Sequence, residues 1–125
     1  MTGRRIRRIG ALSVAFALAL PLLAQYETIV VGHPIRAQRL AGIVEDSIGT
    51  PIAGVVVEDR DAAFKGVLAT TKTDANGHFA FPGTAHGKTH HLHLQSLGFD
   101  PLEITVELHR AGVQLEMRVA LHVAS

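Results

Sequence analysis

Histidine is the side chain in this sequence best suited to bind a metal ion, and five of the eight histidines of the 125-residue chain fall close together: His78, His86, His90, His91 and His93. Side chains two residues apart on a β-strand project from the same face, about 6.5 to 7 Å apart. His91 and His93 could therefore share one Zn²⁺ or Cu²⁺ ion, with His86 as a third ligand. His90 would point to the opposite, core-facing side and take no part.

A simpler interpretation of these histidines is favoured. His91 and His93 alternate with Leu92 and Leu94, as polar positions do on the solvent face of a sheet. Metal-bound imidazoles are usually oriented by a carboxylate, and no Asp or Glu lies between positions 74 and 100 of the sequence. The sequence therefore predicts no required cofactor, with Zn²⁺ or Cu²⁺ at His86, His91 and His93 as the alternative.

Catalytic motifs are missing from the chain. There is no cysteine, none of the eight histidines is followed three residues later by glutamate, and neither H-E-x-x-H nor G-x-S-x-G occurs. A zinc peptidase or a serine hydrolase would need one of these patterns. The sequence predicts a protein that is not an enzyme and has no catalytic residues.

The first 24 residues have the layout of a secretory signal peptide. Four arginines precede an apolar run over residues 9–20, Pro21 breaks the run, and Ala24 supplies the small residue required for cleavage. We expect a secreted or periplasmic protein. The alternative is an uncleaved anchor, because no charge appears from residue 9 to 26, about the shortest span that crosses a bilayer. Membrane contact is expected only in that case.

The charge balance argues against nucleic-acid binding. The chain has 12 basic and 11 acidic residues, but four of the basic ones lie in the predicted signal peptide, which leaves 8 against 11. A net charge of −3 does not suit a phosphate backbone. About a hundred residues without cysteine can form one small domain around a single apolar core.

From residue 40 onward, apolar residues alternate with polar ones, and no helix is expected after residue 25. The pattern predicts seven strands, at residues 40–45, 53–59, 67–73, 78–81, 89–94, 102–108 and 113–123. Each has one apolar face, so we expect a seven-stranded antiparallel β-sandwich, in which two sheets bury those faces against each other. Residues 25–37 are expected to be a linker or an edge strand.

Two local predictions are specific enough to test. Asn76-Gly77 favours a tight hairpin between the strands at 67–73 and 78–81, because Gly77 can adopt positive φ. In the last strand, strict alternation predicts six inward-facing side chains: Val113, Leu115, Met117, Val119, Leu121 and Val123.

Three sequence blocks resemble those of the carboxypeptidase regulatory-like domain family. The blocks comprise Gly42, Asp46, Gly49, Pro51 and Gly54; then Thr73, Asp74, Gly77, Phe79 and Phe81; and finally Gly98 and Phe99. Each residue also has a structural explanation, as a turn glycine, a capping aspartate or a core aromatic. The resemblance covers residues 38–125 and implies a transthyretin-like, or prealbumin-like, sandwich, a fold grouped with carbohydrate-binding-like folds.

The resemblance also implies a role without catalysis. Members of this family are accessory modules beside metallocarboxypeptidase catalytic domains, at the front of outer-membrane receptors or in secreted surface proteins. This sequence shows no such neighbouring domain, so we expect a secreted, stand-alone interaction module that binds an unknown protein or cell-envelope partner. Carbohydrate binding is an alternative, disfavoured because Trp is absent and most Phe residues take inward positions. Metal binding is the other.

Overall fold

The protein is built of β-strands and loops. The computed structural model describes residues 27–83 and 88–125, and no helix occurs within these ranges. The described residues form nine strands: β1 (Ile29–Val30), β2 (Ile35–Ala37), β3 (Ala41–Glu45), β4 (Val56–Arg60), β5 (Val67–Lys72), β6 (His78–Ala80), β7 (Thr89–Gln95), β8 (Leu102–Leu108) and β9 (Met117–Ala120).

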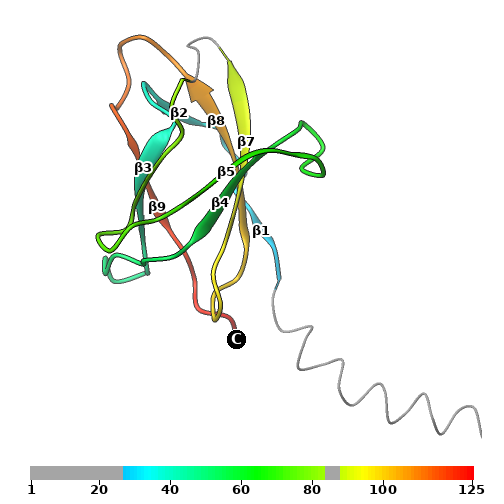
Figure 1. Ribbon diagram of the computed structural model, residues 1–125, viewed down its shortest axis with the longest axis vertical. Helices are drawn as coiled ribbons and strands as arrows, with labels where there is room; N and C mark the ends of the chain where they lie inside the picture. The colour runs from blue at the N-terminus through cyan, green and yellow to red at the C-terminus, as the bar shows by residue number, and fades with distance from the viewer. Residues whose placement is uncertain (1–26, 84–87) are drawn as a thin grey trace, which may run out of the picture.

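The strands form two sheets that face each other across the core (Figure 1). The larger sheet has the order β1-β8-β7-β4-β5, with β2 also paired to β8, and the smaller one has the order β6-β3-β9. The predicted β-sandwich is confirmed, but it has nine strands rather than seven. The purely antiparallel arrangement is wrong, because β1 and β2 run parallel to β8, and β9 runs parallel to β3.

Period-two alternation defines the core, as the sequence predicted. Every second residue of β8 is buried and the residues between are partly exposed. Val57 on β4 and Leu92 and Leu94 on β7 are completely buried on the same inner face. Phe79 and Phe81, from the smaller sheet, meet edge to face with ring centroids 6.4 Å apart. These side chains make one continuous apolar core between the sheets.

The segment before residue 38 is an edge element rather than a linker. Residues 29–37, which we call the strap, lie along β8 as two short strands separated by residues 31–34. Ile29 and Ile35 pack against the core from this edge. Of the two expectations for residues 25–37, the edge strand is confirmed for this part.

The expected hairpin at Asn76-Gly77 is wrong. Gly77 does adopt positive φ, at 79°, but β5 pairs with β4 in the larger sheet whereas β6 pairs with β3 in the smaller sheet. The N–H of Thr73 donates to the Val55 carbonyl on one side, and the N–H of Val44 donates to the Gly77 carbonyl on the other. The turn therefore carries the chain from one sheet to the other.

The last strand is shorter than predicted. Met117, Val119 and Leu121 are buried as expected, but Leu115 is 53% exposed and Val123 is 68% exposed, so their inward assignment is wrong. Before β9, Gln114 bridges to Ala37 of the strap, and after it Val123 bridges to Phe99. The chain changes its pairing partner at both ends of β9. Leu115 and Val123 therefore no longer follow the alternation that buries Met117, Val119 and Leu121.

Candidate functional site

The structure places the clustered histidines on different surfaces. His91 and His93 share the outer face of β7, and His90 points inward, as predicted, whereas His78 lies on β6 in the smaller sheet. His86 lies outside the described residues. The two proposed ligands on β7, His91 and His93, therefore lie on one face. Other side chains of the protein contact both of them there.

His93 is buried, with 7% of its surface exposed, so the favoured interpretation of a solvated polar position is wrong for this residue. Its Nδ1 lies 3.2 Å from Glu103 Oε2 on β8, and its Nε2 lies 3.2 Å from Gln95 Oε1. The orienting carboxylate comes from the neighbouring strand. Alternation within residues 102–108 places Glu103 outward, but only the strand order reveals which residue it meets.

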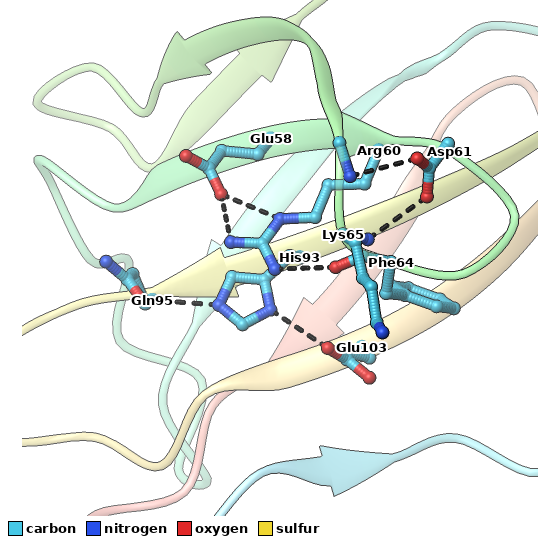
Figure 2. Close-up of polar contacts among 9 residues, drawn as sticks. Glu58, Arg60, Asp61, Phe64, Lys65, His93, Gln95 and Glu103 are labelled. Carbon is cyan, nitrogen blue, oxygen red and sulfur yellow. Dashed lines mark hydrogen bonds and ion pairs between the residues drawn. The ribbon is translucent and has the colours of Figure 1, made fainter.

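A second charged pair lies beside His93. Glu58 on β4 is the direct cross-strand neighbour of His93, and Arg60 holds the Glu58 carboxylate through its Nε, at 2.9 Å, and its Nη2. Arg60 Nη1 also donates to the Phe64 carbonyl at 2.9 Å. Figure 2 shows these contacts converging on the outer face of the larger sheet. We call Glu58, Arg60, His93, Gln95 and Glu103 the outer-face network.

The outer-face network binds its own members rather than presenting free ligands. Both ring nitrogens of His93 have polar neighbours, and no group of three metal-ligating side chains with suitable geometry occurs in residues 27–83 and 88–125. The ring of His91 packs against Phe64 at a centroid distance of 5.3 Å. With His86 outside the described residues, the metal site at His86, His91 and His93 stays a prediction.

On the inner face, His90 forms a buried polar pair with Asp59. The distance from His90 Nδ1 to Asp59 Oδ2 is 2.9 Å, and the two side chains are 15% and 9% exposed. Asp59 Oδ1 and His90 Nε2 are buried without a partner among the described residues. Asp59 occupies a position that alternation would assign to an apolar residue, so the sequence offered no signal for this pair.

Three loops are capped by aspartate in the same way. The carboxylates of Asp46, Asp61 and Asp74 each accept N–H groups from the residues two and four positions later. The N–H of the third residue after each aspartate donates to that aspartate's own carbonyl. The family-like motif residues Asp46 and Asp74 therefore have the predicted structural role, and Asp61 is a third example that the sequence analysis missed.

The electrostatics of two of these loops follow from the same contacts. The N–H groups of Lys65 and Gly66 lower the pKa of Asp61. Those of His78 and Asn76 lower the pKa of Asp74. Hydrogen bonds that favour the ionised carboxylate explain both shifts. These aspartates are structural caps and are not poised for proton transfer.

The remaining motif residues also have structural positions. A Cβ on Gly42 would lie 2.3 Å from the Met117 carbonyl oxygen, so glycine lets β3 and β9 approach closely. Thr73 Oγ1 accepts the Val55 N–H and donates to the Ile52 carbonyl. Gly98 adopts φ of 92°. Pro51 bridges to Glu45, Gly54 also has positive φ, and Phe99 packs against the core.

A shallow hollow of about 550 Å³ opens where β4 begins and β7 ends. It is lined by Gly54, Val56, Gln95, Ser96, Leu97, Phe99 and Pro101. Leu97 is 92% exposed, and no charged side chain lines the hollow. The hollow has no group that would fix a polar ligand by charge.

β5 is an exposed edge strand. This strand lies at the edge of the larger sheet, where five of its six residues pair with β4 and with no other described strand. Five of the six are exposed and Thr71 is partly exposed, so both faces meet solvent. Val67 and Leu68 are 49% and 70% exposed. An edge strand of this kind is a template onto which another strand can add.

No curated protein matches the chain. Among solved structures, a 3-chlorocatechol 1,2-dioxygenase from Rhodococcus opacus 1CP is similar at 18% identity with a TM-score of 0.39, covering 67% of this chain. The chain spans about half of that protein, 49% of its length. Within the described residues, no helix is long and apolar enough to span a bilayer.

The family is shown by the match over residues 39–122, which includes all three motif blocks and strands β3 to β9 of the two sheets. This family is a regulatory, non-catalytic module. The chain belongs to the carboxypeptidase regulatory-like domain family.

Proposed function

We propose that this protein is a secreted, non-catalytic interaction module of the cell envelope, which binds an extended protein segment along the open edge of β5. The observation that carries the proposal is the exposure of β5 on both faces while its backbone pairs with β4 on one side only. The free side offers main-chain donors and acceptors, which an added strand would satisfy.

The hydrogen-bond pattern identifies the groups available to that segment. The Thr73 N–H donates toward β4, to the Val55 carbonyl at 3.0 Å. Successive residues of an antiparallel strand direct their N–H and C=O groups to alternate sides. The backbone groups of Thr70 and Lys72 therefore face the open edge. Their side chains lie on the outer face of the sheet, beside Glu58 and Val56.

Two other surfaces of the larger sheet support this assignment by contrast. The opposite edge of the larger sheet is occupied by the strap along β8. On its outer face, Glu58 pairs with Arg60 and Glu103 lies against His93, so the carboxylates of that network already have partners within it. Secretion rests on the arginine-rich, apolar leader at residues 1–24 and belongs to the same proposal.

The test is photo-crosslinking in the native cell. A benzophenone amino acid replaces Leu68 on β5, and in a matched control it replaces Ile48, which is 85% exposed in a loop of the smaller sheet. We expect a discrete adduct in the envelope fraction from position 68 and none from position 48. Equal adducts from both positions, or none from position 68, would overturn binding at β5.

Localisation is tested separately. Mass spectrometry of the protein released by osmotic shock should give a chain beginning at Gln25. A chain of full mass that stays in the cytoplasm would overturn the secreted part of the proposal and leave the crosslinking result to decide the binding part.

A further inference from the structure

We infer that the segment bound by β5 is acidic and places a carboxylate side chain beside Lys72, on the outer face of the larger sheet. The inference rests on the proposed function, because it names the chemistry of the partner at the same edge. The charge of Lys72 and the side chains around it support this assignment.

Lys72 is a cation without an ion pair. In residues 27–83 and 88–125, four arginines pair with glutamates, whereas Arg110 and the three lysines, Lys65, Lys72 and Lys88, have no ion pair. Lys72 is the one member of this unpaired group that lies in a described strand. It is exposed, so its ammonium group can meet a carboxylate of a partner.

The neighbours of Lys72 on the outer face are uncharged. Val56 lies directly opposite on β4, and Gln95 lies opposite Val56 on β7. Glu58, two residues further along β4, is held by Arg60. In the described part of the sheet, no carboxylate therefore compensates the charge of Lys72. The open side of β5 is where a partner would supply one.

A strand added to β5 would bring a side chain to that position. The backbone groups of Lys72 face the open edge, where they would pair with the added strand. Neighbouring strands lie about 4.8 Å apart, and the side chains of paired residues share a face. One residue of the segment would thus stand beside Lys72 on the outer face. A glutamate or aspartate there forms the cross-strand ion pair that Lys72 lacks.

The same lysine disfavours other segments. A lysine on an edge strand opposes the addition of a further strand, because a basic side chain beside it is repelled and an apolar one removes water from the ammonium group. A carboxylate compensates the charge instead. On the inner face, Ala69 and Thr71 are small and uncharged, so they place no comparable demand on the segment. Lys72 therefore selects among extended segments by charge.

Charge reversal at Lys72 tests the inference in the native cell. In the full chain carrying benzophenone at position 68, Lys72→Glu should reduce the adduct at least about fivefold, whereas Lys72→Arg, which keeps the charge, should retain it. The matched control is Lys88→Glu, which reverses an unpaired lysine outside β5 and should leave the adduct unchanged.

Binding of defined peptides measures the preference directly. The probe is an acetylated and amidated peptide, Thr-Val-Thr-Glu-Thr-Val-Thr, compared with versions that carry Gln or Lys at the centre. NMR shifts of the Thr70 and Lys72 amide groups report occupation of the edge. We expect the Glu peptide to bind at least about fivefold more tightly than the Lys peptide, and the order to reverse in Lys72→Glu.

An adduct that survives Lys72→Glu, or equal affinity for the three peptides, would overturn the acidic partner and leave binding at β5 in place. Loss of the adduct in Lys88→Glu as well would also overturn it, as would amide signals that no peptide moves. If the protein with unaltered Lys72 gave no adduct from position 68, the proposed function itself would fall, and the inference with it.

Discussion

Phe64 occupies, in the loop between β4 and β5, the place that Gly77 occupies in the turn between β5 and β6. Each is the third residue after a capping aspartate, and each adopts positive φ, at 60° and 79°. Among the described residues, Phe64 is the one non-glycine with this conformation. A bulky side chain is held there by the Arg60 contact to its carbonyl and by the packing of its ring against His91.

Substitution of Phe64 should separate backbone strain from ring packing. Phe64→Gly removes a strain of about 1 kcal/mol and a ring contact of similar size, so the free energy of unfolding should change by less than about 1 kcal/mol. Phe64→Val keeps the strain, loses the ring contact and adds a β-branch, so it should destabilise by about 2 kcal/mol. Urea unfolding distinguishes the two, and equal losses would contradict the strain argument.

Glycine positions with the same conformation should differ in their tolerance of alanine. A Cβ on Gly77 would lie 2.6 Å from the Val44 carbonyl oxygen, whereas one on Gly49 would meet nothing within 4 Å. Gly49→Ala should lower the free energy of unfolding by about 1 kcal/mol, which is the energy of the left-handed conformation alone. Gly77→Ala should cost at least twice as much, because β3 must also move. Thermal unfolding of both variants is the measurement, and equal costs would show that the turn relaxes freely.

Acid should weaken the fold through Asp61 and Asp74. Their pKa values are below the ordinary value of 3.8, so each stabilises the folded state at pH values above 3.8 and loses this contribution as the pH falls through its folded pKa. The melting temperature should therefore drop below about pH 4 for this reason. In the double variant Asp61→Asn, Asp74→Asn, that part of the drop should disappear. An unchanged pH profile would contradict the linkage.

Removing one partner of the buried pair Asp59 and His90 should lower the free energy of unfolding, whereas replacing both with apolar residues should change it little. Asp59→Ala leaves a buried imidazole without its partner, and a loss of about 2 kcal/mol is expected. Replacing both with apolar residues, as in Asp59→Val with His90→Leu, should restore most of that stability. A double-mutant cycle in urea measures the coupling. Additive losses would show that the two groups act independently.

The sequence predicted those features of the fold that depend on neighbouring residues. Alternation in residues 102–108 gave the buried face of β8, and the Asp-x-x-Gly pattern predicted the turns at Asp46 and Asp74. Prediction from the sequence was wrong for features that depend on the order of the strands in the sheets. The turn at Gly77 has the expected φ, yet nothing local indicates that its two strands belong to different sheets.

The outer-face network shows the same limit. His93 and Glu103 are ten residues apart in the sequence, and their contact exists because β7 and β8 pair in one register. The exposure of Leu115 and Val123 likewise depends on bridges to Ala37 and Phe99, which are distant in sequence. The open edge of β5 could be identified only after every other described strand had been placed.

The bridges near the two ends of the sandwich have a mechanical consequence. The N–H of Ile29 donates to the Pro101 carbonyl, and Val123 bridges to Phe99, so both ends of the described domain are held by one short segment before β8. Tension applied between Ile29 and Val123 would load this segment first, together with the adjoining pairing of β1 with β8.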